Sequence, residues 1–511
     1  MSTWSYLLIP FQNPLLIVLV AIGTFVGIYV AAIPGLTGTM AVALLVSFTY
    51  GWNTHSALAI MLGVFMGAAY GGSRSAILLN IPGAPSAVAT AFDGYPLALK
   101  GQAGKAIGVA TVQSCLGGII GILALMLFTP LISKFAMNFA ARDYLMLAFI
   151  GMMMVGSLGA KSLTKSLFSA VLGIMLGTVG MDAVTGAQRF TFGNAYLMPG
   201  ISPIVAMIGL FGCSEALIQI FNKDEKRVKQ DVDKIIPSFK STLKYIPLTL
   251  KSSAIGTLVG ALPGAGGSIA ALLAYDQAKR STKNPEVPFG EGAIEGLVAP
   301  ESANNAAVGG ACIPMLTLGI PGDPVTAIIM GAMFIHGLQP GPSLMTKTPD
   351  LFYLIVMCLL LSCVFMLVFG LTGIKIFTKV VEISTGRLMP IIIVLSAVGA
   401  YAINKNLYDV FWMVAFGIIG AVMKRYDYPT APMVLGLILA SMIEKNLRAV
   451  LILGGASEEG LALNLITGIF TNPISLILFL IIVFTILSQT KWYQRQKAAR
   501  EQKRTARKAA K

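Results

Sequence analysis

The stretch "SRSAILLNIPGAPSAVATAFDGYPLALKG", residues 73–101, interrupts a chain whose first 73 residues contain no Lys, Arg, Asp or Glu. Its core, Ile81-Pro82-Gly83-x-Pro85, returns as Ile320-Pro321-Gly322-x-Pro324 within residues 317–341. Proline disfavours a helix before it, and glycine permits a tight reversal. Each copy therefore predicts a re-entrant hairpin. The first has a half-helix at 73–80, a tip at 81–85 and a return at 86–99; the second has 311–319, 320–324 and 325–337.

The composition is that of an integral membrane protein. Of 511 residues, 56% are hydrophobic and 12% are charged, and the mean hydropathy is +0.79, whereas soluble domains have about 25% charged residues. We expect about 12 transmembrane helices in an all-α polytopic fold, because lipid leaves the backbone no other hydrogen-bond partners and no barrel alternation is visible. The long apolar runs lie at 15–33, 106–129, 144–158, 166–181, 203–221, 247–262, 351–372, 389–403, 407–423, 430–443 and 470–488.

The net charge of +15 is concentrated at the flanks of apolar spans. Nine Lys and Arg lie within the last 21 residues, and a charged segment occupies 222–244. The positive-inside rule places both in the cytoplasm beside the lipid bilayer, so no nucleic-acid partner is expected. The N-terminus resembles no cleaved signal peptide. The scattered cysteines and the two distant histidines predict neither a metal site nor a cofactor.

The chain is internally duplicated around residues 222–244. A shift of 239 positions superposes the two Ile-Pro-Gly-x-Pro motifs, and a shift of 229 superposes "PGLTGT" at 34–39 on "PGAGGS" at 263–268. We predict a membrane repeat at 1–221, a charged cytoplasmic linker at 222–244, a second repeat at 245–490 and a basic cytoplasmic tail at 491–511. The uncharged N-terminus and the cytoplasmic linker fit inverted insertion of the two repeats. Matching Gly/Pro breaks are typical of secondary-transporter binding sites.

Broken helices expose termini that bind ions. An N-terminus offers free N–H groups to a carboxylate, and carbonyls or carboxylates suit a cation. The candidate substrate ligands are Thr37, Gly38, Thr39, Arg74, Asn80, Pro82, Gly83, Ser86, Gly266, Gly267, Ser268, Asn304, Asn305, Thr317, Pro321 and Gly322, with Thr90 and Thr326 as further hydroxyls. Glu301, Ser302 and Asp323 are the candidate cation ligands, for Na⁺ or H⁺.

Each of these features has a structural alternative. The Pro-Gly breaks also suit kinks in packed spans, and the glycine-rich elements, which lack the lysine of a Walker loop, also suit close helix packing. Arg74 suits either a bidentate carboxylate contact or a position at the membrane interface. Asp323 and Asp276 suit a position at the membrane interface as well as they suit a binding site.

Four motifs in order resemble the large membrane permease subunit of the tripartite tricarboxylate transporters, the TctA-type family. They are "IPGLTGTMAVALL", "GGSRSAILLNIPGAPSAVATAFDGYPLALKGQAGKAIG", "LPGAGG" and "ESANNAAVGGACIPMLTLGIPGDPVTAIIMGAMFIHGLQPGP", spanning 32–342. The resemblance implies a bacterial inner-membrane permease with two partners, a small four-helix membrane subunit and a periplasmic solute-binding protein. It also implies uptake driven by an ion gradient, with citrate, other tricarboxylates, dicarboxylates or aromatic carboxylates as the substrate.

The resulting hypothesis is a binding-protein-dependent carboxylate symporter subunit that alternates access. The alternatives are a stand-alone secondary anion carrier, a channel lined by backbone carbonyls, or a polytopic membrane enzyme. An enzyme would need a convergent nucleophile, acid/base or metal set, and the sequence offers none that can be assembled.

Overall fold

The computed structural model describes residues 3–33, 36–158, 162–182, 185–220, 239–283, 285–373, 385–453 and 470–488. Most of these residues are helical, and the strands in this part of the chain are the short antiparallel pair β1 (Gly180–Met181) and β2 (Gln188–Arg189). By contacts, the chain forms two units. Unit 1 comprises Met1–Met137 and Val179–Tyr426, and unit 2 comprises Asn138–Thr178 and Asp427–Lys511.

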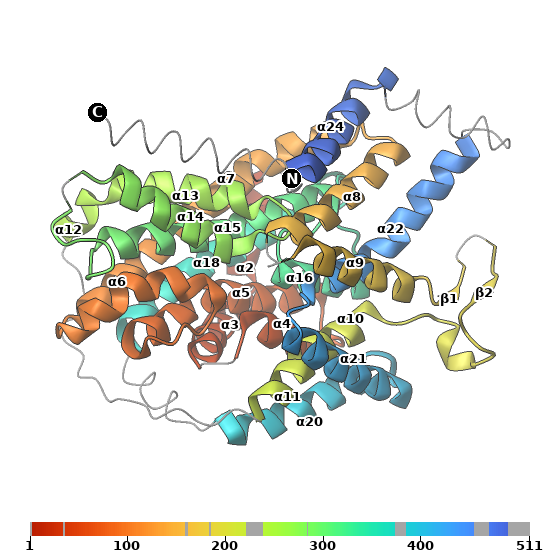
Figure 1. Cartoon of the computed structure of the whole chain (residues 1–511), viewed down its shortest axis with the longest axis horizontal. Helices are drawn as coiled ribbons and strands as arrows, with labels where there is room; N and C mark the ends of the chain where they lie inside the picture. Colours follow the sequence, from red (N-terminus) through yellow and green to blue (C-terminus); the bar gives the residue numbers. More distant parts are fainter. Residues whose placement is uncertain are drawn as a thin grey trace. The chain divides into compact units, whose positions relative to one another are not determined.

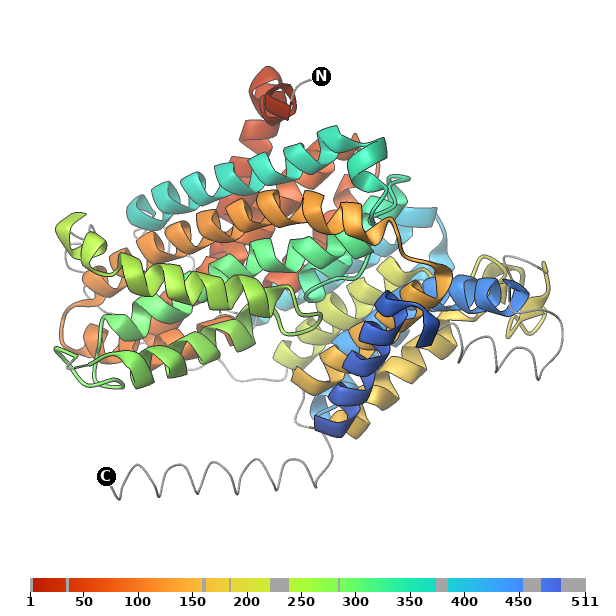
Figure 2. The same cartoon turned by 90° about the horizontal axis from the view of Figure 1, so that it is seen from above.

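Long helices form the core of unit 1, and α7 and α18 lie side by side in it (Figure 2). The core helices are α3 (Pro14–Ala32), α5 (Thr54–Leu79), α7 (Ala103–Ala136), α13 (Ile246–Gly260), α15 (Glu295–Leu318) and α18 (Pro349–Thr372). The backbones of α3 and α5 approach closely because Gly23 of α3 faces Gly63 of α5, and a Cβ on Gly23 would lie 3.2 Å from the Gly63 Cα. Small residues permit such contacts between membrane helices.

Shorter helices of unit 1 complete the two hairpins and the connections between the long helices. They are α1 (Thr3–Leu7), α2 (Ile9–Gln12), α4 (Gly38–Thr49), η1 (Pro85–Ala87), α6 (Val88–Leu99), η2 (Ala195–Leu197), α12 (Phe239–Lys244), α14 (Gly266–Ser281), α16 (Pro324–Ile335) and α17 (Leu344–Lys347). Two of them cross between the halves of the sequence: α4 packs against α16, and α14 packs against η1 and α6. Helices from both halves therefore surround both hairpins (Figure 1).

Two bundles each combine helices from both halves of the sequence. In unit 1, the segment α10 (Pro203–Met207), η3 (Ile208–Cys213) and α11 (Ser214–Ile220) packs with α20 (Thr385–Asn404) and α21 (Leu407–Arg425). In unit 2, α8 (Ala141–Leu158) and α9 (Leu163–Gly177) pack with α22 (Ala431–Leu453), and α24 (Pro473–Ser488) contacts α8. Both units therefore draw on both halves, and the predicted repeat boundaries stay a prediction.

The all-α membrane fold is confirmed. Among the described residues, six helices are long and apolar enough to span a membrane, and five shorter apolar helices accompany them. The apolar runs coincide with helices to within a few residues, except that α7 extends seven residues beyond the predicted end at 129 and α22 extends ten residues beyond the predicted end at 443. The five cysteines are buried and form no disulfide. Pro34, Gly35, most of the linker (222–238) and the whole tail (491–511) lie outside the described residues.

The predicted half-helices at 73–80 and 311–319 are wrong in one respect. Each is the end of a continuous helix, α5 of 26 residues and α15 of 24 residues, and only the return helices α6 and α16 are short. Helix α5 contains no proline, and α15 continues through Pro300 and Pro314. The break comes at the tip because a left-handed residue follows each helix.

Candidate functional site

The two hairpin tips share one backbone design. Helix α5 ends at Asn80 and α15 ends at Gly319, and both residues are left-handed, with φ of 57° and 69°. These two residues correspond under the 239-residue shift. Asparagine and glycine are the residues that adopt this conformation at least cost. Asn80 therefore terminates a helix, and its side chain is exposed at the tip.

At each tip, the backbone of the Pro-Gly pair packs closely against the helix that leads into the tip. The Gly83 N–H donates to the Gly72 carbonyl at 3.3 Å, and a Cβ on Gly322 would lie 2.5 Å from the Cα of Ala311. The N–H of Gly264, in the second glycine-rich element, donates to the Gly322 carbonyl at 2.7 Å. Pro82 and Pro321 precede these glycines and cannot donate. The glycines are required here because a side chain would strike a backbone.

Four short helices begin around the tips, and they differ in how their first N–H groups are satisfied. The Thr37 hydroxyl accepts from the Met40 N–H at the start of α4, and the Asp323 carboxylate accepts from the Thr326 N–H at 2.7 Å at the start of α16. The Thr326 hydroxyl bonds back to Asp323 to form a capping box. By contrast, neither η1, which leads into α6, nor α14 has a side-chain cap or an acidic residue in its first turn.

The two uncapped helices are neighbours, and so are the two capped ones, since α14 contacts η1 and α4 contacts α16. Ser86, in the uncapped η1, is 9% exposed, and its hydroxyl has no hydrogen-bond partner within the described segments. The hydroxyls of Ser268 in α14 and Thr39 in α4 are likewise unpaired within those segments. Gly38 starts α4, and Gly266 and Gly267 start α14.

The second glycine-rich element and the second tip come together with the polar cluster of α15. A Cβ on Gly266 would lie 3.3 Å from the Cβ of Asp323, and one on Gly267 would overlap the side chain of Asn304. The Asn304 amide donates to the Ala69 carbonyl of α5 at 2.6 Å. Three predicted regions thus meet at one place, as the broken-helix hypothesis expects.

Glu301 is buried at a junction of four helices. Its Oε1 accepts hydrogen bonds from the hydroxyls of Ser73 at 2.6 Å and Thr90, and its Oε2 accepts from Ser114 at 2.6 Å. These residues belong to α5, α6 and α7. A buried carboxylate requires such donors because burial removes its hydration. Ser73 and Ser114 were not predicted, and serines in apolar helices give no signal of this contact.

The other polar residues of α15 face other partners. The Asn305 amide donates to the Glu301 carbonyl at 3.2 Å, and its Oδ1 is buried with no partner within the described part of the chain. The Ser302 hydroxyl donates to the Val298 carbonyl at 2.7 Å and lies 3.3 Å from Oε1 of Gln113. The Thr317 hydroxyl donates to its own helix at Ile313. Ser302 and Thr317 therefore use their hydroxyls in packing contacts.

Arg74 is fully buried within the protein. Its Nη2 donates to the carbonyls of Phe369 and Gly370, at 2.9 and 2.6 Å, in the last turn of α18. Its Nε donates to the Tyr70 hydroxyl, and the guanidinium lies over the rings of Tyr29 and Tyr70. A cation here satisfies the free carbonyls and the negative dipole of a helix C-terminus. A contact with substrate remains a prediction for this residue.

Asp93 is a buried carboxylate that the sequence analysis missed. Its Oδ1 accepts from the N–H groups of Gly290, Gly292 and Ala293 at 2.8–2.9 Å, and its Oδ2 accepts from the Tyr275 hydroxyl at 2.9 Å. It thereby fixes α6 to the segment that leads into α15. A lone aspartate in the apolar return arm was the available signal.

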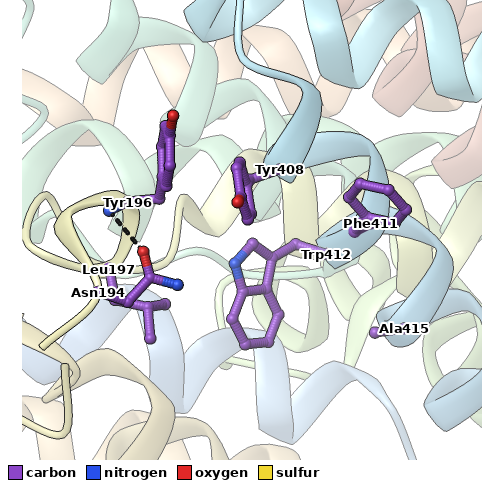
Figure 3. Close-up of a pocket in the computed structure, with 7 residues that line it drawn as sticks. All are labelled: Asn194, Tyr196, Leu197, Tyr408, Phe411, Trp412 and Ala415. Atoms are coloured by element: carbon purple, nitrogen blue, oxygen red, sulfur yellow. Dashed lines mark hydrogen bonds between the residues drawn. The ribbon is translucent and has the colours of Figure 1, made fainter. Parts of the chain in front are cut away.

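An apolar pocket of about 300 Å³ lies in a different part of unit 1 (Figure 3). The rings of Tyr196 and Tyr408 stack with centroids 4.0 Å apart, and the Asn194 side chain accepts from the Tyr196 N–H. No predicted site residue lines this pocket. The lining residues are Asn194, Tyr196, Leu197, Tyr408, Phe411, Trp412 and Ala415. Such aromatic clusters are typical of membrane interfaces.

Comparison with known proteins identifies the family. Residues 17–435 match the tripartite tricarboxylate transporter TctA family. An uncharacterized 52.8 kDa protein in the TAR-I ttuC' 3' region of Agrobacterium vitis is 35% identical over 466 residues, which cover 91% of each chain. An uncharacterized protein in the TAR-II ttuC' 3' region of Agrobacterium vitis is 38% identical over 220 residues, 43% of this chain and 87% of its own. No solved structure matches the chain. The chain belongs to the tripartite tricarboxylate transporter TctA family.

Proposed function

We propose that this chain is the permease subunit of a binding-protein-dependent carboxylate uptake system driven by a Na⁺ or H⁺ gradient. Family membership makes it a multi-pass membrane subunit of a tripartite transporter, which implies partner subunits. We assign as partners a small four-helix membrane subunit and a periplasmic solute-binding protein. The location is the bacterial inner membrane, with the C-terminus in the cytoplasm because of the basic tail.

The observation that carries the proposal is that two contacting elements, η1 with α6 and α14, both begin without a side-chain cap. Free N–H groups and the positive end of the helix dipole favour a carboxylate. The Ser86 hydroxyl in η1 adds a neutral donor to this N-terminus. The other two N-termini already hold their own acceptors, Thr37 and Asp323. We therefore assign the anion to the first hairpin and α14.

We assign the cation to the carboxylates of α15 and of the tip that follows it. Glu301 and Asp323 are carboxylates with no basic partner among the described ion pairs. A carboxylate in a membrane-embedded site carries a proton or binds a cation when its own charge is not paired. Neutralising one of them during transport would couple the ion gradient to movement of the substrate.

Uptake of radiolabelled citrate and of a dicarboxylate tests the proposal, in cells that express the permease with its two partner subunits. Ser86→Ala and Ser268→Ala should each raise the KM several-fold, because each removes one hydroxyl donor to the anion. Ser362→Ala is the matched control, since this buried hydroxyl donates to Cys358 of its own helix. Unchanged KM values in both variants would contradict the anion site. Uptake by the permease alone would favour a stand-alone carrier.

A further inference from the structure

One carboxylate holds both arms of the first hairpin. Ser73 lies near the end of α5, the incoming arm, and Thr90 lies on α6, the return arm, and both hydroxyls donate to Oε1 of Glu301. Ser114 of α7 donates to Oε2 of the same carboxylate. Glu301 itself belongs to α15, in the second half of the chain. Glu301 is thus the ionisable group of the second half that contacts both arms of the first hairpin near its tip.

The hydrogen-bond pattern matches an ionised carboxylate. An ionised carboxylate only accepts hydrogen bonds, and here three hydroxyls donate to it. A protonated Glu301 would carry an O–H donor, so at least one of the three hydroxyls would have to stop donating to it and either accept from the acid or turn away. The contacts of 2.6 Å between carboxylate and hydroxyl oxygens also leave no gap for a metal cation between them. Proton binding is therefore the event to which this arrangement is most sensitive.

The surrounding charged groups are occupied elsewhere. On α5, Arg74 is bound to the carbonyls at the end of α18. On α6, Asp93 is bound to the backbone at residues 290–293 and to Tyr275 of α14. On α7, the neighbouring titratable group is the buried thiol of Cys115. Of the described residues, none forms an ion pair with Glu301, so a proton is what can neutralise it without moving a helix.

Asp93 provides the fixed point for such a change. It lies three residues after Thr90 on α6, on the same face of the helix, and its carboxylate is saturated by four donors. Loss of the Glu301 contacts would free the tip end of α6, while the Asp93 contacts, one turn further along, would keep the middle of the helix in place. The return arm would then swing about Asp93.

We propose that Glu301 is a proton-operated latch on the first hairpin, with Asp93 as its pivot. This rests on the proposed function, and it names H⁺ as the coupling ion. A proton arriving from the periplasmic side forms an O–H bond at a carboxylate oxygen, and the Ser73 or Thr90 bond opens. The same proton is later released from Glu301 to the cytoplasmic side, which restores the ionised, latched state. No other bond forms or breaks, and no electron is transferred.

The test measures access to the hairpin tip without substrate. Ala84 lies at the tip and is partly exposed, so Ala84→Cys introduces a thiol there, and the parent chain with its five buried cysteines is the blank. In proteoliposomes, the rate of maleimide labelling, normalised to a model thiol at each pH, should rise as the pH falls. Glu301→Gln, which mimics the protonated state, should label on the order of tenfold faster at neutral pH, the factor for losing one charge-assisted hydrogen bond. Its labelling should no longer depend on pH.

Two further variants keep the test decisive if Glu301→Gln fails to fold. Ser73→Ala removes one latch hydroxyl and should also speed labelling, whereas Ser362→Ala, whose hydroxyl bonds only within α18, should not. Equal labelling in Ser73→Ala and Ser362→Ala would overturn the latch. Labelling that follows Na⁺ at constant pH would overturn the assignment to a proton. Because labelling needs no substrate, a working latch without carboxylate uptake would refute the proposed function and leave the latch standing.

Discussion

The Asp93 junction gives the sharpest prediction about stability. Replacing Asp93 with alanine leaves three backbone N–H groups, of Gly290, Gly292 and Ala293, and the Tyr275 hydroxyl without their acceptor. Each buried, unsatisfied group costs about 1–3 kcal/mol. Because Gly290 is exposed and its N–H can recover water, we expect a loss near the lower end of the sum, about 4 kcal/mol.

Two milder variants test the size of this predicted loss of stability. Tyr275→Phe removes one donor and leaves the other three in place, which should cost about 1.5 kcal/mol. Asp93→Asn keeps an oxygen for the backbone N–H groups but loses the charge, and the Tyr275 hydroxyl can turn to accept from the new amide. We expect an intermediate loss of about 2 kcal/mol.

The assay is thermal unfolding of the purified chain in detergent, followed by tryptophan fluorescence at one fixed scan rate. Membrane proteins of this size often unfold irreversibly, so the order of the apparent Tm values is the measured quantity. The expected order is parent, Tyr275→Phe, Asp93→Asn and Asp93→Ala, from highest to lowest. If Asp93→Ala unfolds no earlier than Tyr275→Phe, the backbone contacts contribute little and the pivot is refuted.

Three more perturbations test the tips and the buried arginine. Arg74→Lys should lower the Tm more than Arg280→Lys does, because an ammonium cannot bridge two carbonyls and a tyrosine hydroxyl, and Arg280 is exposed. Gly322→Ala should slow uptake at least tenfold in transport assays because its Cβ strikes a backbone, whereas Gly51→Ala, with open space around it, should not. Asn80→Val should destabilise by about 1–2 kcal/mol and Asn80→Gly should not, by denaturation in detergent, because of the left-handed φ.

Most membrane helices could be predicted because length and composition decide them, whereas the glycine-rich α5 (Thr54–Leu79) was not among the predicted runs. The apolar run at 247–262 is α13 at Ile246–Gly260, and that at 351–372 is α18 at Pro349–Thr372. The half-helices were mispredicted because a short arm was expected on both sides of each Pro-Gly tip, whereas the incoming arms are the ends of the long helices α5 and α15. In α15, Pro300 and Pro314 lie inside a continuous helix, and neighbouring helices can satisfy what a proline removes.

The site could be predicted only in part. Glu301 is conspicuous as a charge in an apolar stretch, but its serine partners are not, because a serine in a membrane helix can equally bond its own backbone, as Ser362 does. Asp93 was missed because its partners are backbone N–H groups about 200 residues away, at 290–293. Contacts of this kind depend on the arrangement of helices, which the local sequence does not encode.

The duplication gives both hairpin tips the same backbone conformation. The side chains that differ between the two copies give the tips different chemistry. Asn80 and Gly319 occupy matched left-handed positions, so the helices end alike in both hairpins. Ala84 and Asp323 are also matched, yet Asp323 caps its own helix and Ala84 leaves η1 uncapped. A tip that already holds a carboxylate repels a second one, whereas an uncapped tip attracts it. Unequal tips allow one hairpin to bind the anion while the other half supplies the group that responds to the ion gradient.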